Sequence, residues 1–148
     1  MKNAAQTRIR LARASDATRL AALSGELGYP ATDKEIRARL AKLKPTSEHA
    51  VFVAETDEGV VGWLHVSRDH LLEVPVRAEI NGLVVSAMAR SHGVGRLLLL
   101  AAEDWARKQK CTGMSVRSNV IRDRAHAFYE REGYEHYKTQ KAFRKPLK

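Results

Sequence analysis

A basic turn with two glycines stands between a strand-like segment and a long amphipathic helix, and it offers the first recognisable chemistry. Arg90 to Arg96 reads R-S-H-G-V-G-R and directly follows a segment rich in β-branched residues. The first N–H groups of a helix have no partner within the helix and carry the positive end of its dipole. Glycine lets a ligand approach the backbone closely, and the arginines add positive charge. The turn is therefore predicted to bind an anion such as phosphate; the alternative is that its glycines only make the chain turn sharply.

Two common phosphate-binding loops do not match this turn. A dinucleotide fingerprint, G-x-G-x-x-G/A, needs a small residue where Leu98 stands, and an acidic residue about 20 positions further on. The loops of nucleotide hydrolases need Lys-Ser/Thr after the second glycine, where this chain has Arg96 and Leu97. What remains is the pattern R-x-x-G-x-G at the start of a helix that follows a strand.

A second cluster of chemically capable residues lies nearer the C-terminus. Asp123 to Glu132 is predicted to form a short helix that Gly133 ends, with Ala125, Phe128 and Tyr129 on its inner face. Together, R-x-x-G-x-G and A-x-x-F-Y-x-x-x-G-Y resemble the two signature motifs of the GNAT superfamily of N-acetyltransferases. The resemblance implies that backbone amides of the first motif hold the pyrophosphate of acetyl-coenzyme A. It also implies that the tyrosine of the F-Y pair points at the cofactor sulfur.

The resemblance gives Tyr129 a chemical role. When an amine attacks a thioester a thiolate leaves, and a phenol held nearby can give it a proton. Tyr129 is therefore the predicted general acid; the alternative is an aromatic side chain that only packs on the buried face of its helix. Cofactor contacts are implied for Leu83, Val84, Val85, Arg90, Ser91, His92, Gly93, Val94, Gly95, Arg96, Asn119, Arg122, Ala125 and Phe128.

One position departs from the family pattern. Many members carry an asparagine three residues before the helix alanine, where it reaches the pantetheine arm, and this chain has Arg122 there. Asn119 lies earlier in the same loop and is the candidate replacement. Arg122 is instead suited to contact a phosphate group.

The acceptor amine must lose a proton before it attacks, so a base is expected as well. Some family members use a glutamate of the central strand for this, often through water, and Glu79 stands at the corresponding place. The alternative is that Glu79 is a solvated residue at the edge of the sheet. Asn81 would share a face with Glu79 in an unbulged strand, which makes it the candidate for orienting substrate or water.

Two helices are predicted before the central part of the chain. The first begins near Asp16 and ends at Gly28, because Pro30 prevents its continuation. The second begins at Asp33 within the capping-box pattern T-x-x-E. In the family this region shapes the acceptor side, so Tyr29 is the candidate substrate contact. Alternatively, Tyr29 only covers the helix pair.

Strand patterns recur along the rest of the chain. Predicted strands are Arg8 to Ala14, Ala50 to Thr56, Val60 to Ser67, Ala78 to Val85, Met114 to Arg117 and Lys138 to Lys148. Short turns imply antiparallel neighbours, whereas the helix that starts at Val94 implies a parallel crossover to the strand at Met114. Within the central strand, Gly82 is predicted to mark a bulge or a place of close approach.

The predicted fold is one GNAT-like domain over residues 1–148, of mixed α/β (α+β) class. Its mostly antiparallel sheet is expected to have about six or seven strands, one splayed parallel pair, and helices on both faces. The last strand lies in a basic tail, and similar final strands of the family contribute to dimers. A homodimer is therefore compatible with the resemblance.

Length and composition exclude several classes of protein. A chain of 148 residues with 44% hydrophobic and 29% charged residues suits one globular domain. No apolar run approaches the roughly 20 residues that span a bilayer, and the start of the chain lacks an apolar signal core. With the single cysteine, Cys111, these features predict a cytoplasmic protein without a membrane partner. No metal-ligand spacing such as H-E-x-x-H occurs, so no metal is expected.

The positive charge is unevenly distributed. Of the net charge of +9, residues 1–78 carry +2 and residues 79–148 carry +7. The excess thus lies in the half with the predicted anion site, where it suits a polyphosphate cofactor. It would also attract nucleic acid non-specifically. No zinc-finger or RNA-binding signature is present, and that disfavours nucleic acid as the partner.

The sequence therefore predicts an acetyl-CoA-dependent N-acetyltransferase that acts on a primary amine by direct attack in a ternary complex. The acceptor is predicted to be a small molecule, with aminoglycosides among the candidates. Two alternatives remain open: N-acetylation of a protein or peptide, and a non-catalytic module that binds acyl-CoA or nucleic acid.

Overall fold

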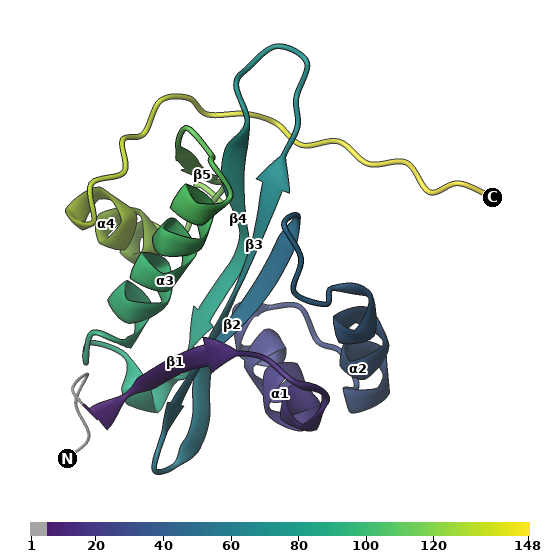
Figure 1. The fold of residues 1–148 in the computed structure, drawn as a ribbon, viewed down its shortest axis with the longest axis vertical. Coiled ribbons are helices and arrows are strands. Elements are labelled where there is room, and N and C mark those ends of the chain that lie inside the picture. Colours follow the sequence, from purple (N-terminus) through teal and green to yellow (C-terminus); the bar gives the residue numbers. More distant parts are fainter. Residues whose placement is uncertain (1–5) are drawn as a thin grey trace. The chain divides into compact units, whose positions relative to one another are not determined.

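The computed structural model describes residues 6–148 (Figure 1). The chain forms two compact units. The first unit ends at Val116 and contains the sheet, whereas the second runs from Arg117 to Lys148 and contains one helix. Within residues 6–148, no helix has both the length and the hydrophobicity that a bilayer crossing requires.

A single sheet of five strands organises the first unit. The strands are β1 (Arg8–Leu11), β2 (His49–Thr56), β3 (Gly59–Asp69), β4 (Arg77–Val85) and β5 (Met114–Val116). They lie in chain order across the sheet, as Figure 1 shows. The pairings are antiparallel up to β4, whereas β4 and β5 are parallel. The predicted crossover to β5 is therefore confirmed.

Helices cover both faces of this sheet. They are α1 (Ala17–Leu27), α2 (Asp33–Lys42) and α3 (Val94–Lys108). Gly62 of β3 lies against Leu98 of α3, whereas the next residue, Trp63, packs against the core formed with α1 and α2. Because successive strand residues point to opposite faces, α3 covers one face and the α1–α2 pair covers the other.

The helix ends follow the predicted local signals. Gly28 ends α1 in the left-handed conformation with φ 98°. At the start of α2, the Glu35 amide donates to Thr32 Oγ1 at 3.1 Å, and the Thr32 amide donates to Glu35 Oε1 at 2.9 Å, which is the predicted capping box. Gly93 precedes α3 with φ 80°, a conformation that favours glycine.

The apolar core fills the space between the sheet and the helices. On the α1–α2 side its buried residues are Leu20, Leu23, Val53, Val60 and Val84. The buried face of α3 comprises Val94, Leu98, Leu99, Ala102 and Ala106. Leu97, Ala101 and Trp105 of the same helix are only half-buried.

The second unit contains α4 (Asp123–Arg131) close to the predicted bounds, but the predicted strand at Lys138–Lys148 is wrong. Phe143 and Leu147 are 90% and 91% exposed, so the few apolar residues among the lysines bury no common face that would hold a strand. The sheet therefore has five strands instead of six or seven. The homodimer was considered because of a final strand in this tail, and residues 138–148 form no strand.

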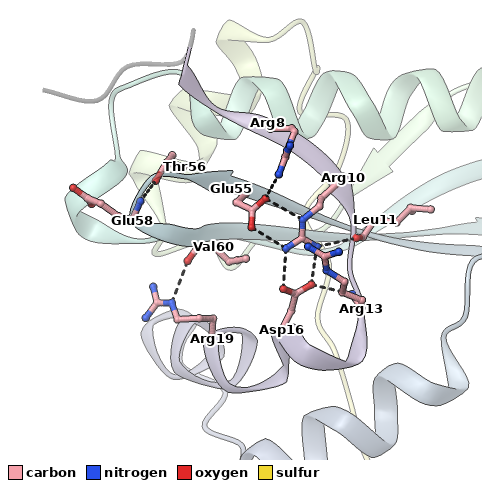
Figure 2. Close-up of polar contacts among 10 residues, drawn as sticks. All are labelled: Arg8, Arg10, Leu11, Arg13, Asp16, Arg19, Glu55, Thr56, Glu58 and Val60. Atoms are coloured by element: carbon pink, nitrogen blue, oxygen red, sulfur yellow. Dashed lines mark hydrogen bonds and ion pairs between the residues drawn. The ribbon is translucent and has the colours of Figure 1, made fainter.

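An ion-pair network fixes the start of the first unit (Figure 2). The Arg10 guanidinium donates to both carboxylate oxygens of Asp16 at 2.9 Å and to Glu55 at 3.2 and 3.3 Å. Arg8 donates to the same Glu55 at 2.7 Å. The network joins β1 to β2 and to the short 3-10 helix, Ala14–Asp16, that leads into α1. This 3-10 helix also explains why β1 ends at Leu11, before the predicted limit.

The carboxylates of this network are held in the ionised form. Burial opposes ionisation of Asp16, but the hydrogen bonds from Arg10 and from the Arg13 amide outweigh it, so the pKa of Asp16 lies below its ordinary value. Hydrogen bonds from Arg10 and then from Arg8 lower the pKa of Glu55 to about 2. Both groups thus stabilise the fold above the unfolded-state pKa, and this contribution is lost as the pH falls towards 2.

Replacing Asp16 by alanine is expected to lower the free energy of unfolding by about 2 kcal/mol at pH 7, because a buried charge-assisted pair loses one partner. The difference from the unaltered protein should shrink as the pH falls below about 4, where unfolded carboxylates become protonated. Urea denaturation at several pH values measures both effects. Glu73→Ala, at an exposed loop carboxylate, is the matched control. A pH-independent difference would show that the Asp16 charge does not stabilise the fold.

Candidate active site

The parallel ladder between β4 and β5 is short. It pairs Ala78 with Met114, Glu79 with Ser115 and Ile80 with Val116, where β5 ends. Strand β4 continues to Val85 in antiparallel pairing with β3. The second half of β4 is therefore paired with a strand of the first unit on one side only.

Backbone groups of two predicted cofactor residues face the open side of β4. The Ser86 amide donates to the Val61 carbonyl at 2.8 Å, so Ser86 faces β3. Because residues of an antiparallel strand face their partner alternately, Val84 also faces β3, and Leu83 and Val85 face away from it. In agreement, the Val85 carbonyl accepts a hydrogen bond from Arg90 Nε at 3.2 Å. An extended ligand arm could pair with Leu83 and Val85 as a strand would.

The basic turn lies between β4 and α3, as predicted. A short 3-10 helix, Ala87–Ala89, leads into it, and Ser91 and Gly93 adopt positive φ angles of 69° and 80°. These two residues reverse the chain so that α3 begins at Val94. The exposed Arg90 and Arg96 flank the turn. A helix start with this geometry can hold an anion through its first backbone amides.

A bulge interrupts β4 next to these groups. His65 of β3 is in register with Gly82, but the following Val66 is in register with Ile80, so Asn81 is the extra residue. The bulge thus falls at Asn81 and not at Gly82. The alternative for Gly82, close approach, is confirmed, because a Cβ there would lie 2.8 Å from ring atoms of Trp63. Asn81 was expected on the face of Glu79 if the strand had no bulge, and the bulge removes that condition. Asn81 still reaches that face, since its Nδ2 donates to Ser67 Oγ at 2.8 Å.

A pocket of about 410 Å³ opens between the α1–α2 pair and the sheet. Its apolar wall consists of Leu20, Leu27, Ile36, Leu40, Leu43 and Val51. Its more polar lining consists of Ser24, Tyr29, Arg39, Trp63, His65 and Asn81. Both predicted substrate residues, Tyr29 and Asn81, are thus brought together here. In the described part of the chain, no aspartate or glutamate lines this pocket.

A row of polar side chains crosses the same face of the sheet. His49, Ser67, Glu79 and Ser115 are in register from β2 to β5. Glu79 is only 4% exposed, so it is not the solvated edge residue of the alternative interpretation. Ser115 Oγ donates to Glu79 Oε1 at 2.5 Å and fixes this carboxylate. Glu79 does not line the pocket itself.

Sequence reasoning missed His49, His65, Ser67 and Ser115. A signal for two of them was available, because W-L-H-V-S in β3 alternates and thus places His65 and Ser67 on one face with Trp63. Their proximity to His49 and Glu79 depends on the register between strands, which the alternation within one strand does not give.

The second unit holds the remaining predicted residues. Burial raises the pKa of Tyr129 to about 12, and Arg122 opposes this shift only weakly. The Tyr129 ring lies 5.2 Å from that of Phe128 and 5.9 Å from that of Tyr134, centre to centre. Tyr129 therefore remains a protonated phenol over the whole physiological pH range and can act as a proton donor.

The two alternatives in the loop before α4 differ in their surroundings. Asn119 Oδ1 accepts a hydrogen bond from the Ile121 amide at 3.1 Å, and the Asn119 carbonyl contacts His126 Nε2 at 2.8 Å. Asn119 thus shapes the loop. Arg122 is exposed just before α4 begins. Among residues 6–148, no group of three or more His, Cys, Asp or Glu side chains is placed to hold a metal ion.

Gly82→Ala is expected to push the Trp63 ring out of position, because the added Cβ would overlap it. Overpacking of this kind should lower the free energy of unfolding by about 1–3 kcal/mol. Thermal and urea denaturation measure it. Gly113→Ala is the matched control, since nothing lies within 4 Å of a Cβ at that position. Equal stability of the two variants would mean that Trp63 does not need the space above Gly82.

Comparison with known proteins connects these features. The family model of the acetyltransferase (GNAT) family matches residues 11–134. The aminoalkylphosphonate N-acetyltransferase of Salmonella typhimurium is 32% identical over 123 residues, which are 81% of this chain and 77% of that protein. The uncharacterized N-acetyltransferase YhdJ of Bacillus subtilis is 42% identical over 71 residues, and this match spans 46% of the chain and 47% of YhdJ.

Solved structures share the fold. Aminoglycoside N-acetyltransferase AAC(6')-Iy, crystallised in complex with CoA, superposes with a TM-score of 0.84 at 19% identity, over 95% of each chain. A putative acetyltransferase from Agrobacterium tumefaciens superposes with a TM-score of 0.82 at 24% identity, over 93% of this chain and 99% of that one.

Proposed function

Because this chain belongs to the acetyltransferase (GNAT) family, we propose that it transfers the acetyl group of acetyl-coenzyme A to the primary amine of a small molecule. The proposed reaction is a direct attack in a ternary complex. The observation that carries the proposal is the open side of β4, where Leu83 and Val85 present backbone groups. Trp63, which lines the pocket, is in register with Val84 of the same segment. The proposed site for the extended thioester would thus adjoin the pocket proposed for the amine.

The residues around β4 fit coenzyme A. Leu83 and Val85 would bind the pantetheine arm through the backbone, whereas the backbone groups of Val84 between them face β3. The turn from Arg90 to Arg96 would hold the pyrophosphate, with helix amides and arginine charge acting together. In the second unit, Ala125, Phe128 and either Asn119 or Arg122 are proposed cofactor contacts on the strength of the family motif. Bound in this way, coenzyme A supplies an activated acetyl group and a thiol leaving group.

Two side chains are proposed to move protons. Glu79 accepts the proton that the ammonium of the acceptor loses, through water because Glu79 does not line the pocket. The hydrogen bond from Ser115 holds its carboxylate in place. As the new C–N bond forms and the C–S bond breaks, Tyr129 gives its phenolic proton to the leaving thiolate.

The lining of the pocket favours an acceptor that carries an anionic group over a polycationic aminoglycoside. Several ammonium groups would need carboxylates, and none lines the pocket in the described residues. Arg39 stands at its rim with 62% of its side chain exposed, and Glu35 lies 3.9 Å away. A guanidinium binds phosphonate or carboxylate oxygens in pairs. The relative from Salmonella typhimurium, an aminoalkylphosphonate N-acetyltransferase by name, supports the same class.

A panel of amines tests the function and the acceptor class together. Thiol release from acetyl-coenzyme A is measured with 2-aminoethylphosphonate, ethylamine, kanamycin and a lysine peptide. We expect kcat/KM for 2-aminoethylphosphonate to exceed that for ethylamine by about tenfold or more, which is the effect of one charge-assisted contact. Arg39→Gln should remove this preference. Arg37→Gln, in the same helix but outside the pocket lining, should keep it.

Other outcomes of this panel would contradict the proposal in distinct ways. Preference for kanamycin would favour aminoglycosides, and preference for the peptide would favour protein acetylation. Absence of turnover with every amine, together with salt-dependent binding of duplex DNA, would favour the non-catalytic alternative.

Tyr129→Phe is expected to lower kcat by about 100-fold and to leave binding of acetyl-coenzyme A nearly unchanged, because only the proton donor is removed. Steady-state kinetics and a calorimetric titration with coenzyme A measure the two quantities. Tyr137→Phe serves as the control, since Tyr137 is 64% exposed and lies outside both motifs. An unchanged kcat for Tyr129→Phe would remove Tyr129 from the mechanism.

A further inference from the structure

Two histidines form a pair at the floor of the pocket. His65 of β3 lines the pocket, and His49 of β2 lies beside it on the same face of the sheet. His49 Nδ1 and His65 Nε2 are 3.2 Å apart, and the rings are stacked with centres 5.4 Å apart and an interplanar angle of 27°. The proposed chemistry of Glu79 and Tyr129 does not use this pair.

The short contact between ring nitrogens limits where hydrogens can be. One of the two nitrogens must carry a hydrogen and the other must offer a lone pair. Burial, and after it the neighbouring His49, lower the pKa of His65 to about 4, so His65 is a neutral imidazole near pH 7. If His65 Nε2 donates to His49 Nδ1, then His65 Nδ1 is left with a lone pair. If His49 donates instead, His65 Nδ1 carries the hydrogen.

An amine that binds in the pocket would need a hydrogen-bond acceptor for its N–H groups. Arg39 and the indole of Trp63 only donate hydrogen bonds, and no carboxylate lines the pocket in the described residues. His65 is in register with Gly82, next to the open part of β4 where the thioester is proposed to lie. Ser24 and Tyr29 come instead from α1 and from the segment after it, at the wall that faces the sheet. His65 and Asn81 are thus the acceptors on the β3–β4 side.

Resting on the proposed acetyl transfer, we propose that His65 accepts a hydrogen bond from the amine nitrogen of the acceptor substrate. His49 is the positioning residue that keeps His65 in the tautomer with a lone pair on Nδ1. The pair thus sets the location of the attacking nitrogen, while the proton that it loses goes to Glu79.

This arrangement makes the acceptor at position 49 decisive. Without a group there that accepts the hydrogen of His65 Nε2, His65 can carry its hydrogen on Nδ1, where it opposes the amine instead of accepting a hydrogen bond from it. Loss of the acceptor at position 49 should therefore raise the acceptor KM. Other charged or titratable groups around the pair are Arg39 of α2, Tyr29 after α1, Glu79 of β4 and Asp69 of β3, which Ser67 contacts.

Kinetics of three variants test the proposal with 2-aminoethylphosphonate as the probe amine. His65→Phe should raise the acceptor KM by about 10- to 100-fold, the loss expected for a hydrogen bond to a charged group, and should leave the KM for acetyl-coenzyme A unchanged. His49→Asn keeps an amide oxygen that can accept from His65, so it should leave the acceptor KM nearly unchanged, whereas His49→Leu cannot accept and should raise it. Rescue by asparagine thus separates the positioning role from a merely structural one.

The control is His70→Asn, because His70 is an exposed histidine that contacts Glu48 at 3.2 Å and does not line the pocket. An unchanged acceptor KM in His65→Phe, or equal acceptor KM values in His49→Asn and His49→Leu, overturns the proposal. If circular dichroism shows that His65→Phe is unfolded, His65→Leu takes its place.

Calorimetric binding of the probe amine separates failure of this proposal from failure of the enzymatic function. If the probe amine binds tightly, His65→Phe weakens this binding and no turnover occurs, the role of His65 stands and the transferase function is contradicted. Binding equal in both proteins overturns the role of His65, and absence of both binding and turnover overturns both.

Discussion

Strand β4 changes its neighbours halfway along its length, and the rest of the site depends on this change. Its first half is paired on both sides, with β3 and with β5. Within the first unit its second half is paired with β3 only, so the backbone groups of Leu83 and Val85 face away from their one partner strand. The bulge at Asn81 lies where the two halves meet. One strand therefore combines a segment held on both sides with a segment that the sheet holds on one side.

The two halves of β4 also divide one face of the sheet into different environments. Beyond the bulge, Gly82 leaves room for the Trp63 ring, which completes an apolar pocket with the α1–α2 pair. Before it, Glu79 lies in a buried polar row between Ser67 and Ser115. The apolar pocket and the buried carboxylate are thus separate environments, since Glu79 does not line the pocket.

The parts that could be predicted from the sequence are those set by local chemistry. The helix starts at Asp33 and Val94 and the helix end at Gly28 follow from caps and left-handed glycine, which act within a few residues. The family motif predicted the turn before α3, which is confirmed, whereas the role of Tyr129 stays a prediction. The His49–His65 contact and the burial of Glu79 follow from register between strands, and no local pattern encodes that. The tail at Lys138–Lys148 was wrongly predicted to be a strand. Residues with β propensity do not form a strand without a partner strand and a common buried face.

A free strand edge is usually a hazard, since it offers a template to which another protein chain can add. Here the part of β4 that is not paired with β5 extends only from the bulge at Asn81 to Val85, and the turn that leads to α3 follows at once. Of its residues, Leu83 and Val85 turn their backbone groups away from β3, and the Val85 carbonyl already accepts a hydrogen bond from Arg90 Nε. An incoming strand would therefore find few partners along this edge, and that limits aggregation through it.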